Sequence, residues 1–201
     1  MRQELISTWK AIKPYIDGAN TLLDLGSGRG AFAEKLYSKA RHVIALDIDY
    51  EALSHIDKPF IMKLCADAQN IPLRDESVDV VIAISLIEHL QDPIKCLHEA
   101  SRVLKEGGYL IIQLPNLQYY VEPHTKFPLF ILPYRFKELI RKRLGYAYIN
   151  FNVTLKYILN HTPKELELIR KMDVYHKIKT PPWPPAWILI YKKTNQQQYD
   201  S

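Results

Sequence analysis

Short apolar runs alternate with amphipathic segments through the first 114 residues of the chain. The apolar runs predict buried strands over residues 20–25, 42–47, 59–64, 78–84 and 109–114. Helical spacing of apolar residues predicts helices over residues 3–16, 30–39, 50–56 and 93–104. Asp92 is expected to cap the last of these helices, with Pro93 at its first position. Strands and helices that alternate with short links indicate an α/β fold with a doubly wound sheet and helices on both faces.

This alternation stops after Leu114, where prolines and aromatic residues become frequent. Residues 135–144 are amphipathic, and the capping box Thr162-Pro163-Lys164-Glu165 predicts a helix that reaches about Met172. Two closing strands are expected at 174–179 and 187–192. We therefore predict one domain for residues 1–201. Its parts are an N-terminal helical segment (1–19), a ligand-binding core (20–114), an insertion that forms a lid (115–160), a C-terminal helix with two strands (161–193) and a polar tail (194–201).

A glycine-rich turn follows the first predicted strand. Gly26, Gly28 and Gly30 come directly after Asp24, and Asp47 ends the second predicted strand, 21 residues beyond Gly26. A βαβ unit that binds an adenosine places its ribose acid at about this distance, roughly 20 residues, after the glycine turn. Glycine lets the backbone turn sharply and approach a ligand closely. The pattern predicts a cofactor that contains a nucleoside.

The glycine spacing also bears on which cofactor this is. Dinucleotide-binding turns prefer G-x-G-x-x-G, whereas this chain has G-x-G-x-G with Ala31 at the sixth position. The charge of Asp24 would repel a pyrophosphate but would attract a cationic ligand such as S-adenosylmethionine (SAM). The pattern therefore favours SAM, and an NAD-binding oxidoreductase is the weaker alternative.

The segment from Asp24 to Gly30 resembles motif I of class I SAM-dependent methyltransferases, and the resemblance continues to about residue 115. Residues 65–73 are similar to the family segment in which an acid contacts the adenine amino group. Residues 75–90 and 101–112 resemble the fourth and fifth strands with their flanking turns, and the broad type 11 group is the most similar. The resemblance implies a Rossmann-like sheet of seven strands, mostly parallel, with an antiparallel last strand.

The motifs assign candidate site residues. The expected cofactor-binding residues are Asp24, Gly26, Ser27, Gly28, Gly30, Asp47, Ile48, Asp67, Ala68 and Ile84. For the substrate we expect Tyr119, Tyr120 and Arg135, with His124 as a base or orienting group. The tyrosines could equally form the lid's own hydrophobic cluster, and His124 could equally brace a loop. His89 matches an E-H-L pattern of the family and is expected to serve packing; no Cys/His cluster predicts a metal.

Charge is distributed unevenly along the chain. Residues 1–120 carry 13 basic and 16 acidic side chains, a net charge of −3, whereas residues 121–201 carry 14 and 6, a net charge of +8. The basic part favours an anionic substrate or partner, although an ordinary solvated surface explains it equally well. We expect methyl transfer from SAM to a small or medium-sized acceptor, with S-adenosylhomocysteine (SAH) as the product. A tRNA or protein methyltransferase and a non-catalytic SAM-binding module remain alternatives.

Composition places the protein in the cytoplasm. No apolar run approaches the ~20 residues of a membrane-spanning helix, and the early acid Glu4 argues against a signal peptide. Two isolated cysteines suit a reducing compartment. The segment at 84–87 lacks the Asn/Asp-Pro-Pro-aromatic motif common in adenine methyltransferases of nucleic acids, which favours a small-molecule acceptor.

Overall fold

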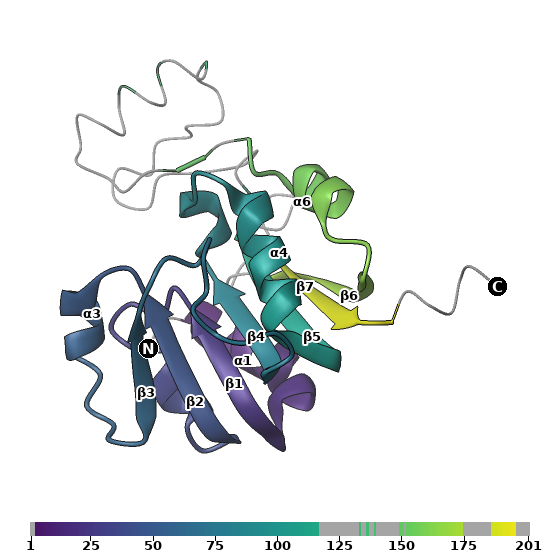
Figure 1. Ribbon diagram of the computed structural model, residues 1–201. Coiled ribbons are helices and arrows are strands. Elements are labelled where there is room, and N and C mark those ends of the chain that lie inside the picture. The colour runs from purple at the N-terminus through teal and green to yellow at the C-terminus, as the bar shows by residue number, and fades with distance from the viewer. Residues whose placement is uncertain are drawn as a thin grey trace.

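The computed structural model describes residues 3–116, 133, 136, 139, 149–150, 152–174 and 186–195. They form a seven-stranded sheet in the order β3-β2-β1-β4-β5-β7-β6 (Figure 1). The strands are β1 (Ala19–Leu25), β2 (Ala40–Asp47), β3 (Ile61–Cys65), β4 (Val78–Ile84), β5 (Leu104–Pro115), β6 (Leu166–Val174) and β7 (Ala186–Lys193). The described strand β7 runs antiparallel to both of its neighbours, β5 and β6, and the other six described strands share one direction. This confirms the Rossmann-like sheet with an antiparallel last strand.

Helices cover both faces of the sheet (Figure 1). They are α1 (Gln3–Ile16), α2 (Ala33–Leu36), α3 (Tyr50–Ser54), a 3-10 turn η1 (Ile87–His89), α4 (Pro93–Val103) and α6 (Leu155–His161). Successive side chains of a strand point to opposite faces, so the apolar strands feed two separate cores. Leu23 packs in the core beneath α4 and α6, whereas its neighbour Leu22 packs in the core beneath α1 and α2.

The strands predicted from apolar runs are confirmed within a few residues, and β4 has the predicted bounds. The α4 cap is also as expected, because the Asp92 side chain accepts a hydrogen bond from the Lys95 backbone N–H at 3.0 Å. Two elements differ in length. The helix expected at 30–39 is reduced to the single turn of α2, and β5 begins at Leu104 rather than at residue 109.

The helix predicted from Thr162 to Met172 is wrong, because this stretch contains most of β6. Thr162 ends α6 instead of beginning a helix: its hydroxyl donates to the Ile158 carbonyl at 2.7 Å. The Glu165 side chain is also engaged elsewhere, since it accepts from the Ser101 hydroxyl at 2.9 Å. The next closing strand was placed too late, since β6 already ends at Val174; residues 175–179 lie outside the described residues. The last strand is confirmed as β7.

None of the described helices has the length and apolarity needed to cross a membrane. In the same part of the chain, His, Cys, Asp and Glu side chains form no group of three that could hold a metal ion.

Candidate functional site

A cavity of about 320 Å³ lies at the carboxyl ends of the parallel strands. In sheets of this type the strand order reverses between β1 and β4, and ligands bind where the loops on either side of that point diverge. Eleven residues line the cavity: Gly26, Leu46, Asp47, Ile48, Asp67, Ala68, Gln69, Leu86, His89, Leu90 and Gln91. They come from the last two residues of β2 and from the loops that follow β1, β2, β3 and β4. The size falls in the range typical of small-molecule sites.

The glycine turn after β1 is fixed to the end of β2. The backbone N–H groups of Gly26 and Ser27 both donate to the Leu46 carbonyl, at 2.8 and 3.0 Å. Gly26 has a φ of +69°, and a Cβ there would lie 2.8 Å from Cδ1 of Leu86. The glycine is thus required twice, by its backbone conformation and by the close approach of the loop after β4.

Asp47 connects this turn to the second strand. Its Oδ2 accepts from the Gly28 backbone N–H at 2.7 Å, and its Oδ1 accepts from the Asp49 backbone N–H at 2.9 Å. Because each carboxylate oxygen can accept more than one hydrogen bond, acceptor capacity remains for a ligand in the cavity. The backbone contacts hold this acid at the cavity wall.

Asp24 lies inside the protein beside the turn and is 2 % exposed. Burial disfavours its charged form and raises the pKa of Asp24 to about 7. A hydrogen bond from the Ala33 backbone opposes this rise, and the nearby charge of Asp47 adds to it. Oδ2 of Asp24 and the hydroxyl of Ser27 have no hydrogen-bond partner among the described residues. Both groups are buried and can accept a donor from a ligand.

The loop after β4 forms the opposite wall and contains unusual backbone and charge features. Ser85 adopts a φ of +52°, a conformation that is rare outside glycine and is found disproportionately at functional sites. Glu88 is 4 % exposed, and burial raises its pKa although the neighbouring His89 lowers it. Its Oε2 has no hydrogen-bond partner among the described residues. The Glu88 carbonyl accepts from the Asn150 backbone N–H at 2.7 Å.

The structure brings together five of the predicted cofactor-binding residues at the cavity wall. These are Gly26, Asp47, Ile48, Asp67 and Ala68. The other five do not line the cavity: Asp24, Ser27, Gly28, Gly30 and Ile84. Gly30 serves packing, because a Cβ there would lie 2.6 Å from Cγ1 of Ile56. Ile84 packs against the core beneath α1 and α2.

Sequence reasoning missed six lining residues, namely Leu46, Gln69, Leu86, His89, Leu90 and Gln91. His89, which was expected to serve packing, also lines the cavity. A usable signal was present: residues 86–91 follow the carboxyl end of β4, where ligands of such sheets bind. The predicted substrate residues Tyr119, Tyr120 and Arg135, and also His124, lie outside the described residues.

Comparison with known proteins gives a consistent picture. A family model described as a methyltransferase domain matches residues 23–112. A Mycobacterium tuberculosis protein named as a probable S-adenosylmethionine-dependent methyltransferase is 32% identical over 182 residues, which are 83% of this chain and 64% of the relative. This chain therefore spans less than two thirds of that relative's length.

Two further matches are more limited. A malonyl-[acyl-carrier protein] O-methyltransferase of Marinomonas is 33% identical over 105 residues, 48% of this chain and 38% of the relative. The crystal structure of an S-adenosylmethionine-dependent methyltransferase from Mesorhizobium loti has a TM-score of 0.73 at 16% identity and covers 96% of this chain and 98% of that one. The structural match concerns the fold alone.

The matched region contains the glycine turn after β1 and the acids Asp47 and Asp67 after β2 and β3. Sequence, fold and motif order agree that residues 23–112 of this chain form a methyltransferase domain of the kind found in class I SAM-dependent methyltransferases.

Proposed function

We propose that this chain binds SAM in the cavity and transfers its methyl group to a small or medium-sized, anionic acceptor, leaving SAH. One observation carries the proposal: the described cavity wall contains two carboxylates, Asp47 and Asp67, and neither lysine nor arginine. A dinucleotide would bring phosphates that need cationic or helix N-terminal partners. SAM brings two ribose hydroxyls, an amino-bearing base and a net positive charge near its sulfur, which suit such a wall.

The described residues divide the recognition between them. In this proposal Asp47 accepts hydrogen bonds from the ribose hydroxyls and Asp67 accepts from the adenine amino group, and their position at the cavity wall supports both roles. The apolar side chains of Ile48 and Leu90 offer surface to the base; Ile48 is 72% exposed although it is apolar. A ligand that covers Ile48 would give a reason for this exposure.

Asp24 and Ser27 fit the charged end of the cofactor. Both present a buried oxygen without a partner among the described residues, and the amino group of the methionine moiety supplies donors. SAM supplies an electrophilic methyl group on a sulfonium. The protein's part is to hold the acceptor in line with that methyl and to exclude water, and a base is needed only where the acceptor must lose a proton.

We place the acceptor site at the insertion that follows β5. The described residues at its two ends support this position, because β5 ends at Pro115 on the carboxyl edge and Asn150 bonds to Glu88 on the same edge. Tyr119, Tyr120 and Arg135 would contact the acceptor there, and His124 would act as a base or orienting group. The net charge of +8 over residues 121–201, and the malonyl substrate named for the Marinomonas relative, favour an acidic acceptor.

A second acceptor class follows from the same charge. A basic C-terminal part would also suit the phosphates of a tRNA or an acidic protein surface. These acceptors are separated by incubating the protein with methyl-labelled SAM and, in parallel, small-molecule extract, RNA and protein. Label in the small-molecule fraction is expected; label in RNA or protein would assign the alternative, and no label in any fraction would favour a non-catalytic module.

Cofactor identity is tested directly by titration calorimetry with SAM, SAH and NAD. We expect micromolar affinity for SAM and SAH and much weaker binding of NAD. Tighter binding of NAD than of SAM would overturn the proposal.

The two free cysteines, exposed Cys65 and buried Cys96, are consistent with a reducing cytoplasm, and we propose this location for the protein.

A further inference from the structure

The carboxylate of Asp67 at the cavity wall is hydrogen-bonded to the side chain of Gln69, which also lines the cavity. We infer that Gln69 is a positioning residue that aims Asp67 at the amino group of adenine and thereby determines which base the site accepts. This inference rests on the proposed function and concerns the selectivity of the same cavity.

Three hydrogen bonds join the two side chains and the loop between them. The Gln69 backbone N–H donates to Oδ1 of Asp67 at 2.8 Å. The Gln69 side-chain Nε2 donates to Oδ1 at 3.0 Å and to Oδ2 at 3.1 Å. Both carboxylate oxygens are therefore held in one orientation by a neighbour two residues along the chain.

A fourth bond fixes the orientation of the Gln69 amide itself. Its Oε1 accepts from the Asp92 backbone N–H at 2.8 Å. Oxygen and nitrogen of a side-chain amide are hard to distinguish by shape, and the bonding partners must decide between them. A backbone N–H can only donate, so the atom facing Asp92 is the oxygen, and Nε2 is the atom that faces Asp67.

This arrangement leaves a defined chemical face toward the ligand. Oδ1 of Asp67 already accepts two hydrogen bonds, whereas Oδ2 accepts one from the described residues. Oδ2 thus retains capacity to accept a donor from the cavity. A carboxylate that only accepts will bind the amino group of adenine and will repel the carbonyl oxygen that hypoxanthine carries at the same position. A site built around one hydrogen bond rejects the analogue that lacks it, because a buried polar group is left unpaired.

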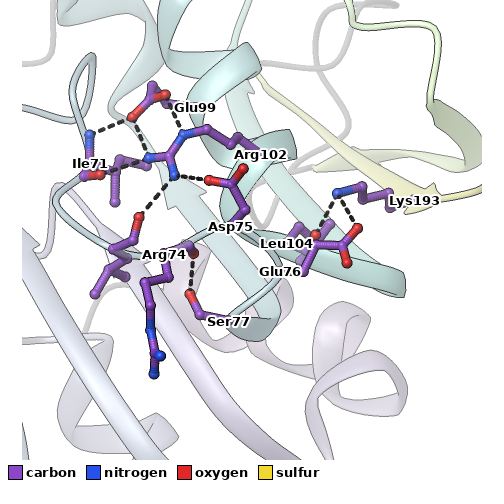
Figure 2. A network of polar contacts seen from close by, with 10 residues as sticks. Ile71, Arg74, Asp75, Glu76, Ser77, Glu99, Arg102, Leu104 and Lys193 are labelled. Atoms are coloured by element: carbon purple, nitrogen blue, oxygen red, sulfur yellow. Dashed lines mark hydrogen bonds and ion pairs between the residues drawn. The ribbon is translucent and has the colours of Figure 1, made fainter.

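The loop is also held independently at its far end. Figure 2 shows the Arg102 side chain of α4 between Glu99, Asp75 and the loop backbone. Arg102 donates to the carbonyls of Ile71 and Leu73 at 2.8 and 2.9 Å. Glu99 accepts from the Ile71 backbone N–H at 2.8 Å. Because these bonds of Arg102 and Glu99 anchor the loop independently of Gln69, removing the Gln69 amide is expected to change the orientation of Asp67 rather than to unfold the loop.

The test compares two ligands, SAH and its deaminated analogue S-inosylhomocysteine, which differ at the position that Asp67 would read. The measured quantity is the ratio of the two dissociation constants by titration calorimetry. The wild-type protein is expected to prefer SAH at least tenfold. In Gln69→Leu, which has similar volume and no amide, the preference should fall by about tenfold, chiefly through weaker SAH binding.

Two further variants separate positioning from loop structure. Gln69→Glu keeps an oxygen for the Asp92 N–H but cannot donate to Asp67, so it should lose the preference while keeping the tie to α4. Asn70→Leu is the matched control, because its exposed side chain lies next to Gln69 in the same loop and does not line the cavity, and it should leave the ratio unchanged. Circular dichroism checks that each variant is folded, and should Gln69→Leu fail to fold, Gln69→Glu decides the question.

The outcomes are distinct. Failure of the wild-type protein to bind SAH would overturn the proposed function itself. Selective wild-type binding combined with an unchanged ratio in the folded Gln69 variants would overturn the positioning role alone. An equal loss of preference in Asn70→Leu would also overturn it, because the selectivity would then not depend on the side-chain bonds to Asp67.

Discussion

Acidic side chains have different surroundings at the two ends of the parallel strands, which form the carboxyl edge and the amino edge of the sheet. At the carboxyl edge, Asp24 and Glu88 are almost fully buried, each has an oxygen without a partner among the described residues, and the pKa of each is raised by burial. At the amino edge, Asp79 and Glu99 are paired with Lys105 and Arg102. The hydrogen bond from Arg102 lowers the pKa of Glu99. Partial burial raises that of Asp79, but bonds from Lys105 and Thr21 outweigh it and the pKa is lowered.

This difference separates carboxyls that stabilise the fold through ion pairs from carboxyls that keep an unpaired oxygen at the carboxyl ends of the strands. A buried carboxyl oxygen without a hydrogen-bond partner costs stability, whereas a paired carboxyl at the protein surface costs little. Such a cost at one edge only is expected where function, rather than folding, selects the residues. Four substitutions test whether the two groups of carboxyls differ in this way.

The largest effect is expected for Asp24→Asn. Between the ordinary pKa of 3.8 and the native value of about 7, the native state binds more protons at Asp24 than the unfolded state does. The contribution of Asp24 to wild-type stability therefore falls as the pH rises through this interval, by at most about 4 kcal/mol. Asparagine cannot ionise, so the free energy of unfolding of the variant should gain on that of the wild type between pH 4 and pH 8. Urea denaturation across this range measures the gain. If the stabilities of the two proteins changed in parallel with pH, the raised pKa of Asp24 would be refuted.

Arg102→Met should destabilise the amino edge by about 2–3 kcal/mol. The change leaves two backbone carbonyls and Glu99 without their donor, and partial exposure of Arg102 lets water replace only some of these bonds. The matched control is Arg74→Met in the same loop, whose exposed side chain points away from the network in Figure 2. The control should cost less than about 0.5 kcal/mol by urea denaturation. Equal losses of stability in both variants would show that the bonds of Arg102 to Glu99 and the loop add no specific stability.

Asp47→Asn should weaken SAH binding about ten- to hundredfold, or roughly 1.5–3 kcal/mol, because charge-assisted bonds to the ribose are lost. The fold should persist, since asparagine keeps one acceptor for the backbone donors Gly28 and Asp49. Asp49→Asn removes a nearby charge that does not line the cavity, and it should bind SAH with nearly wild-type affinity. Titration calorimetry compares the three proteins, and unchanged affinity in Asp47→Asn would make this acid purely structural.

Lys105→Met should have the smallest effect, below about 1 kcal/mol at pH 7. The Lys105–Asp79 pair joins side chains that are 38% and 29% exposed, so solvent screens their attraction. Because the pKa of Asp79 is lowered in the native state, its contribution exists above pH 3.8 and is lost as the pH falls below that value. The variant should therefore approach wild-type stability at pH 3 by urea denaturation. A loss of several kcal/mol at pH 7 would contradict a merely solvated pair.

The parts of the fold that the sequence could predict are those with a local cause. Buried apolar runs located β1, β2, β4 and β5 because central parallel strands that are covered on both faces are apolar over their buried length. Asp92 and Pro93 located the start of α4 because a cap acts within one turn. The helix expected after Thr162 failed because a capping box also fits a residue that ends the preceding helix, and only tertiary contacts of Thr162 and Glu165 decide between these.

The site divided in the same manner. The glycine turn and Asp47 follow the spacing of a single βαβ unit and could be located from it, and Asp67 could be located from the family resemblance of residues 65–73. Gln69 could not, because its role depends on the approach of the start of α4, more than twenty residues away along the chain. The unpaired oxygens of Asp24 and Glu88 depend on how the interior packs, and the spacing of residues along the chain does not predict them.

The attachment of the 67–75 loop to α4 at both ends has a dynamic consequence. Asp92 at the start of the helix bonds to Gln69, and Glu99 and Arg102 farther along bond to Ile71 and Leu73. Helix and loop are therefore expected to open together as one cooperative unit, which native-state hydrogen exchange detects as similar opening free energies for their amide protons. Opening of α4 would then release the cavity wall that contains Asp67 and expose the core beneath α4, while the core beneath α1 and α2 stays packed.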